Sequence, residues 1–294
     1  MSISMRSALY LSLNDLAEAQ TTAYGRGWTS SPTKLMEICR VQSIDLGRSL
    51  VLFDGRSPIG IALVGTRADR GWLHDIAVAP AYRRSGMGRR LMQAVIQEMR
   101  TSGVREIELD VAATRTDAIG LYSKFGFRRR RAYLNLAATY VELGLDRLEL
   151  PTMHQIVAGT EAQLIAAYAT AQHGEPDPCW DRSLASLLLY PDGFISRLLD
   201  GEQELALMHY LARPASGGDP DRLRPLFVRV AAGGGDGILA ELLAGTGRAA
   251  FGDTRRLTVR VALEPQGSTF AALLADIHMP VVAESYDMRL VLAP

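Results

Sequence analysis

The residue types best suited to chemistry stand in one short loop, Arg83-Arg84-Ser85-Gly86-Met87-Gly88-Arg89. The loop lies between a predicted strand that ends at Val78 and a predicted helix with apolar residues at helical spacing. Glycines at the start of a helix expose backbone N–H groups at the positive end of the helix dipole, where an anion binds. The three arginines add charge that reaches phosphates. The pattern therefore predicts a diphosphate-binding loop, and the alternative is a plain tight turn with solvated arginines.

Cysteine chemistry is not indicated. Cys39 and Cys179 stand far apart in the chain and lack the CxxC spacing of zinc and redox sites, which argues against a disulfide framework. Both are predicted to be small buried apolar groups. We expect no metal site.

The elements that position the loop alternate between strands and helices. Asn14 and Asp15 are good N-cap residues, and Ser31-Pro32 opens a further helix. We predict strands at residues 8–13, 49–53, 59–65, 72–78, 106–111 and 127–136, and helices at 14–23, from 32, from 88 and at 117–124. The predicted order is one strand, two helices, three antiparallel strands, and then helix, strand, helix and strand.

Three separated motifs in this order resemble the GNAT superfamily of acyl-CoA-dependent N-acyltransferases. They are the loop residues Arg83, Gly86 and Gly88, the strand run from Asp75 to Pro80, and the later signature Ala118, Tyr122, Gly126 and Phe127. The resemblance covers about residues 6–136. It implies an α+β GNAT fold, a mixed and mostly antiparallel sheet flanked by helices, with acetyl-CoA as the co-substrate.

The resemblance also implies roles for residues outside the loop. The family's strand before the loop splays from its neighbour at a β-bulge, so the free backbone of Ile76, Ala77 and Val78 would pair with the pantetheine amides. Tyr122 would protonate the departing thiolate, and the alternative is an ordinary core aromatic residue. Arg115 stands where the family often has Asn, which leaves a contact from that side chain to the cofactor open.

A general base must take a proton from the acceptor ammonium, because only the neutral amine attacks the thioester. His74 and Asp75 are the candidates on the strand, with water as a third. Strand alternation predicts that the two side chains point to opposite faces. We favour His74, and the alternative is a purely structural histidine.

The loop from Tyr24 to Ser30 would lie over the acceptor side of the family's split sheet. It contains Trp28 between small residues, and an aromatic face suits an apolar or cationic acceptor. Trp28 is therefore predicted to contact the substrate. The alternative is that it anchors the loop or packs between domains.

The second half of the chain is a fainter copy of the first at an offset of about 150 residues. A strand at 224–230, a glycine loop at 233–237 and a helix at 238–243 echo residues 72–92. Its loop has Asp236 and no arginine, and Ala272 replaces Tyr122. We predict a catalytic domain at 1–140 and a degenerate GNAT-like domain at 141–294 that helps to form the acceptor pocket.

Composition narrows the function classes. The chain has 294 residues, 48% hydrophobic and 22% charged, with 32 basic and 32 acidic side chains. This balance argues against nucleic acid and anionic membranes as partners. No segment has the apolar length of a membrane span and no signal peptide is recognised, so we expect a cytoplasmic protein.

The sequence therefore predicts an N-acetyltransferase that moves an acetyl group from acetyl-CoA to a primary amine by direct attack in a ternary complex. The expected partners are acetyl-CoA and an unidentified amine acceptor, and a homodimer is allowed. A non-enzymatic acyl-CoA sensor or structural partner is the alternative. A nucleotide-binding module fits less well, because the loop is not G-x-G-x-x-G and has no P-loop lysine.

Overall fold

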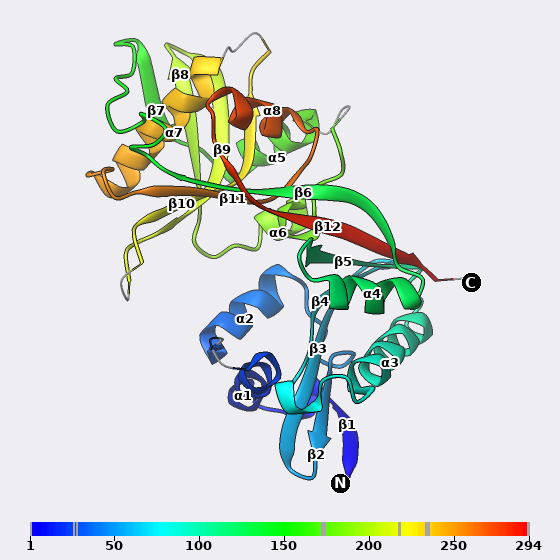
Figure 1. The fold of residues 1–294 in the computed structure, drawn as a ribbon. Coiled ribbons are helices and arrows are strands. Elements are labelled where there is room, and N and C mark those ends of the chain that lie inside the picture. Colours follow the sequence, from blue (N-terminus) through cyan, green and yellow to red (C-terminus); the bar gives the residue numbers. More distant parts are fainter. Residues whose placement is uncertain are drawn as a thin grey trace. The chain divides into compact units, whose positions relative to one another are not determined.

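A computed structural model describes residues 2–25, 27, 29–171, 175–216, 219–232 and 236–292. The chain divides into two compact units. Unit 1 comprises Met1–Arg130 and Tyr286–Pro294, and unit 2 comprises Arg131–Ser285. In each unit, helices pack on both faces of the strands (Figure 1). The domain roles expected from the sequence remain predictions.

Unit 1 has the predicted order of elements. They are β1 (Ile3–Ser7), α1 (Leu13–Tyr24), α2 (Pro32–Val41), β2 (Leu50–Asp54), β3 (Ser57–Arg67), β4 (Arg70–Val78), α3 (Met87–Thr101), β5 (Glu106–Ala112), α4 (Thr116–Lys124) and β6 (Arg128–Thr139). The first strand was placed wrongly at 8–13, because Ser7 accepts a hydrogen bond from the Leu9 N–H and starts a 3-10 turn there.

Local capping explains where the first helices begin. The N-cap of α1 is Ser12 rather than the predicted Asn14 or Asp15, and Asp15 completes a reciprocal capping box with Ser12. The predicted start of α2 is confirmed, since Ser31 caps it and Pro32 occupies the first turn.

Two apolar cores cover the faces of the unit 1 sheet. Helices α1 and α2 pack on one face, and α3 and α4 pack on the other (Figure 1). Within unit 1 the strands follow the order β1, β2, β3, β4, β5, β12 and β6, where β12 contributes residues from Tyr286 onward and β6 contributes residues up to Arg130. The C-terminus of the chain therefore supplies an interior strand to the N-terminal unit.

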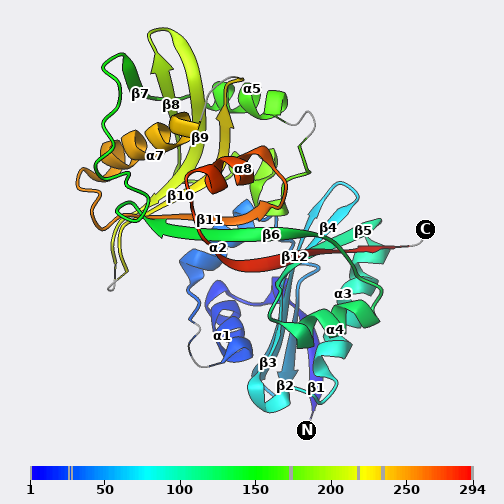
Figure 2. The same cartoon turned by 45° about the horizontal axis from the view of Figure 1, so that its top comes forward.

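Unit 2 repeats this plan. Its elements are β7 (His154–Ala158), α5 (Glu161–Ala171), α6 (Leu184–Leu187), β8 (Gly193–Asp200), β9 (Gln203–Arg213), β10 (Arg222–Val230), α7 (Asp236–Phe251), β11 (Thr258–Pro265), α8 (Thr269–Asp276) and β12 (Val281–Val291). Helices α7 and α8 belong to one core and α5 and α6 to another (Figure 2). The order of its strands is β12, β6, β11, β10, β9, β8 and β7.

The register of the paired strands is the same in the two units, as expected for a duplicated fold. Arg70 pairs with Glu106 in unit 1, and Arg222 pairs with Thr258 in unit 2, both in parallel strands. A bulge falls at His74 in β4 and at Leu226 in β10, the equivalent position.

Across the described ranges, no helix is long and apolar enough to cross a membrane.

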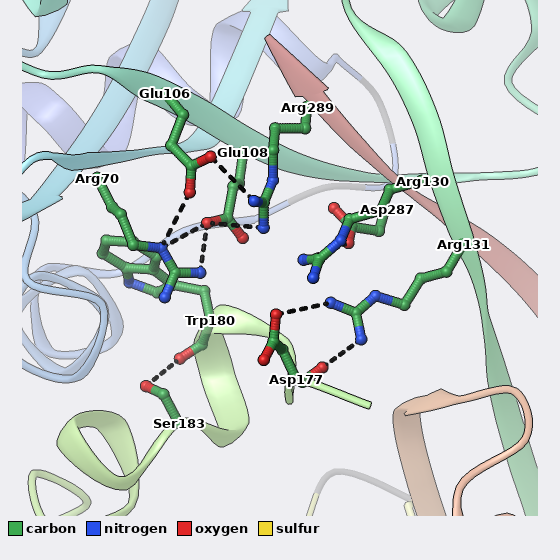
Figure 3. A network of polar contacts seen from close by, with 10 residues as sticks. All are labelled: Arg70, Glu106, Glu108, Arg130, Arg131, Asp177, Trp180, Ser183, Asp287 and Arg289. Carbon is green, nitrogen blue, oxygen red and sulfur yellow. Dashed lines mark hydrogen bonds and ion pairs between the residues drawn. The ribbon is translucent and has the colours of Figure 1, made fainter. Parts of the chain in front are cut away.

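A salt-bridge network joins side chains of β4, β5 and β12 in unit 1 (Figure 3). Arg289 of β12 donates to Glu106 Oε2 at 2.9 Å, and its other terminal nitrogen lies 3.5 Å from Glu108 Oε1. Arg70 of β4 donates from Nε to the same Glu108 oxygen at 2.7 Å. The Glu108 side chain is only 4% exposed. The network therefore ties β4, β5 and the C-terminal strand together.

Acid should destabilise unit 2 through His209. This side chain is buried in β9, and burial lowers its pKa from 6.5 to about 4. Between those values the unfolded chain binds a proton that the folded chain excludes, so stability is full above pH 6.5 and falls as the pH drops toward 4. The expected loss from this group is about 3 kcal/mol. Urea unfolding at a series of pH values should show a shallower acid limb for His209→Gln, whereas an identical limb would contradict this contribution.

Candidate active site

Strands β4 and β5 separate partway along their length. Their parallel pairing runs from Arg70 with Glu106 to Trp72 with Glu108. Beyond that point, β4 keeps β3 as its hydrogen-bonding partner through Val78. The bulge at His74 lies where the separation begins. The splayed strand expected from the resemblance is present, and the edge of β4 facing β5 has backbone groups available to a ligand.

A cavity of about 1040 Å³ opens between the separated strands, entirely within unit 1. It is lined by β4, the loop before α3, the end of β5, and α4. Most residues predicted for the site contribute to its wall, namely His74, Ile76, Ala77, Val78, Arg83, Arg84, Gly86, Gly88, Arg89 and Tyr122. Ser85 and Met87 are not among the lining residues, and Trp28 lies outside the described residues.

The glycine loop ends at the start of α3. Gly86 is the N-cap residue, with φ of 85° in the left-handed region that a side chain disfavours. The first helical hydrogen bond runs from the Arg90 N–H to the Gly86 carbonyl at 3.0 Å. The N–H groups just before Arg90 therefore have no acceptor within the helix, and no acidic side chain stands in the first turn. This geometry attracts an anion.

The three loop arginines differ in what they contact. Arg83 donates from Nε to the Val78 carbonyl at 3.0 Å and from Nη2 to the Tyr24 carbonyl at 3.1 Å. It thus fastens the loop to the ends of β4 and α1. Arg84 and Arg89 are exposed at the cavity, where their charge can reach a bound anion.

Tyr122 lies at the inner wall of the cavity. Its side chain is 8% exposed and its ring is 5.9 Å from that of Phe127. Burial raises the pKa of Tyr122 above its ordinary value, with the positive charge of Arg115 opposing and the negative charge of Asp110 reinforcing this shift. The phenol is therefore protonated at neutral pH and can act as a proton donor.

Asp75 is held by two donors from α1. The Gln20 amide and the Tyr24 hydroxyl both donate to its buried carboxylate. Burial first and Asp75 second raise the pKa of Tyr24 above its ordinary range. His74 and Asp75 both line the cavity, and the bulge interrupts the regular register of β4 at this point. Asp75 is thereby engaged in the packing of α1 on β4, whereas His74 is half-buried at the opening.

Asp110 was missed from the sequence, whereas Arg115 was named there with its contact left open. Asp110 of β5 lines the cavity opposite β4, and its charge acts on Tyr122. The alternation of Glu106, Glu108 and Asp110 along β5 could have placed this carboxylate at the opening. Arg115 donates to Asp117 at 3.3 Å and lowers the pKa of that carboxyl.

Comparison with known proteins identifies the family of the segment that contains this site. The family described as "Acetyltransferase (GNAT) family" matches residues 13–127. This part of the chain belongs to the GNAT acetyltransferase family. It contains the loop, the splayed strands and Tyr122.

Curated relatives match a shorter segment. The [ribosomal protein bS18]-alanine N-acetyltransferase of Escherichia coli K12 is 41% identical over 68 residues, which are 22% of this chain and 46% of that protein. The Haemophilus influenzae protein of the same name is 33% identical over 79 residues, or 27% and 53% of the two chains. The chain thus spans about half the length of the curated relatives it matches.

Solved structures with the same fold match this chain over nearly its whole length. A tandem GNAT protein from the clavulanic acid biosynthesis pathway has a TM-score of 0.70 at 12% identity, covering 100% of this chain and 99% of that one. A GCN5-related N-acetyltransferase from Sphaerobacter thermophilus has a TM-score of 0.63 at 18% identity, covering 99% and 96%. The GNAT fold and the tandem arrangement predicted from the sequence are confirmed.

Proposed function

We propose that this GNAT protein transfers an acetyl group from acetyl-CoA to a primary amine, using the cavity of unit 1. One observation carries the proposal. The separation of β4 and β5 brings an anion-binding helix N-terminus, a free strand edge and a buried, protonated tyrosine to one cavity.

The cavity suits acetyl-CoA along its length. The free N–H groups before Arg90, together with Arg84 and Arg89, would hold the diphosphate. The edge of β4 from Ile76 to Val78, which lies beyond the pairing with β5, would pair with the two pantetheine amides as an added strand does.

The reaction is direct transfer. The neutral amine attacks the thioester carbonyl, the C–S bond breaks, and Tyr122 gives its proton to the thiolate. His74 or Asp110, directly or through water, takes the proton that the ammonium must lose. Backbone N–H groups near the bulge would stabilise the negative oxygen of the intermediate. Neither Cys39 nor Cys179 is among the cavity residues, so no acyl-enzyme is proposed.

A screen for amine acceptors tests the function. The full chain is incubated with acetyl-CoA and a library of small amines and peptides, including a peptide with N-terminal alanine because of the curated relatives. Release of the CoA thiol with at least one amine is expected. Tight acetyl-CoA binding with no release for any amine would favour the sensor alternative. Calorimetry with NAD and ATP tests the nucleotide-binding alternative, and the expected result is no binding.

Replacement of Gly86 tests the loop. Gly86→Ala adds a Cβ that meets no atom within 4 Å, so the cost to the fold is the left-handed strain of about 1 kcal/mol. Because the loop would approach the diphosphate closely, acetyl-CoA affinity should fall at least about tenfold. Gly103→Ala is the matched control, since Gly103 has φ of 80°, equally open surroundings and no place in the cavity wall. Equal acetyl-CoA affinities in the two variants would remove this loop from the binding site.

A further inference from the structure

Unit 2 has a cavity of its own, with a volume of about 320 Å³. It lies beside β10 and β11, which pair in parallel at Arg222 with Thr258 and at Leu223 with Val259. Helices α5 and α8 complete its wall. It therefore occupies the place in unit 2 that the proposed acetyl-CoA cavity occupies in unit 1, as the equivalent bulges at Leu226 and His74 show.

The inner wall of this cavity contains a buried arginine. Arg182 is 5% exposed, forms an ion pair with Glu264 of β11, and donates from Nη2 to the Pro225 carbonyl of β10 at 3.3 Å. Its guanidinium thus bridges the two strands where they separate. The Nε of Arg182 is buried and has no hydrogen-bond partner in the part of the chain that the structure describes. A buried N–H without an acceptor is costly, and a ligand with an acceptor oxygen would remove that cost.

A second arginine of the wall repeats this feature. Arg229 of β10 pairs with Glu204 through Nη2, and its Nε is buried without a partner among the described residues. Both arginines line the cavity. A carbonyl oxygen placed between apolar walls would find N–H donors at either position.

The remaining wall is apolar and aromatic. The rings of Tyr168 and Phe227 lie 5.4 Å apart, and the Arg182 guanidinium lies 5.8 Å from the centre of the Phe270 ring. Leu226 and Leu273 add aliphatic surface. A cavity with such walls and a few polar groups is typical of a small-molecule site.

Charge decides the class of ligand. The charged residues among the described wall are Arg182, Arg229, Glu175 and Glu264, two of each sign. Both carboxylates are engaged, since Glu175 accepts from the Thr269 N–H at 3.0 Å and Glu264 from the Ser268 hydroxyl at 2.5 Å. An anionic ligand would unbalance this set, and the segment before α7 supplies no arginine or lysine for a diphosphate.

We propose that the cavity of unit 2 binds a small uncharged molecule with an apolar body and a carbonyl oxygen that accepts from the buried arginines. This site is separate from the acetyl-CoA cavity proposed for unit 1 and does not depend on it. Acetyl-CoA itself should not enter, because Arg182 and Arg229 are already paired with glutamates and the segment before α7 has no arginine or lysine for its diphosphate.

Three probes built on the same phenylpropane skeleton test the proposal on the full chain by calorimetry. N-acetyl-phenylalaninamide is uncharged with carbonyl acceptors, N-acetyl-phenylalanine adds a carboxylate, and propylbenzene has no acceptor. The amide should bind with a Kd below about 1 mM, and each of the other two at least about tenfold more weakly. No binding of the amide, or equal binding of the acid, would overturn the proposal.

Two variants locate the site. Leu273→Trp and Val230→Trp each place an indole in the cavity from a different wall, so one remains informative if the other fails to fold. Either folded variant should lose at least about tenfold in amide affinity. Unchanged affinity in a folded variant would overturn the assignment to this cavity. Displacement of the amide by acetyl-CoA in these titrations would also overturn it, because it would show a second acyl-CoA cleft.

Discussion

Replacing Tyr122 with phenylalanine is expected to lower kcat about 100-fold or more with the amine selected by the screen. The change removes only the hydroxyl, so the packing of the ring against Phe127 and the helix α4 should survive. Without the phenol, the thiolate leaves unprotonated. Because binding of acetyl-CoA does not use that proton, its Kd should change little. Steady-state kinetics and calorimetry on the same variant measure both quantities.

Tyr82→Phe is the matched control for this experiment. The Tyr82 hydroxyl donates to Asp54 at 3.0 Å and does not line the cavity, so kcat should stay within about twofold of the wild type. Since burial raises the pKa of Tyr122, the phenol should also remain a donor when the pH rises to about 9. A Tyr122→Phe variant with full turnover would assign this side chain to the core alone.

Replacing Arg289 with alanine should weaken unit 1 and its cavity together. The change leaves Glu106 and the buried Glu108 with Arg70 alone, at an expected cost of about 3 kcal/mol in unfolding free energy. Glu106 and Glu108 belong to the first and the last of the pairs that join β4 and β5 before the strands separate. Acetyl-CoA affinity should therefore fall at least about tenfold, although Arg289 lies outside the cavity.

Arg213→Ala provides the comparison for Arg289. Arg213 pairs with Asp192 at 2.8 Å, but the two side chains are 40% and 55% exposed, so its removal should cost less than about 0.5 kcal/mol. Urea unfolding and acetyl-CoA titration are run on both variants. If Arg289→Ala matched Arg213→Ala in both measurements, the C-terminal strand would have no part in shaping the cavity.

The sequence predicted the parts of the site that short segments determine. The loop from Arg83 to Arg89 and the signature around Tyr122 each form within about ten residues, where glycine conformation and helix spacing fix the geometry. Both therefore lie at the predicted places.

The missed features depend on contacts between distant residues. Asp75 is engaged by Gln20 and Tyr24, more than fifty positions away in the chain. Arg289 reaches Glu106 across 183 positions. The resemblance implied a bulge in β4, but its position at His74 is set by the register with β3. Single-strand patterning does not specify such pairings, so the partners of Asp75 and the C-terminal strand of unit 1 were not predicted.

A calorimetric titration of acetyl-CoA into the full chain tests most directly whether unit 1 alone is the acyl-CoA site. The loop with arginines occurs once, so we expect one molecule bound per chain, with binding weakened at least about tenfold by Gly86→Ala and unchanged by Gly103→Ala. Two molecules per chain would show that unit 2 has kept an acyl-CoA site. No binding to the wild type would contradict the function proposed for the cavity between β4 and β5.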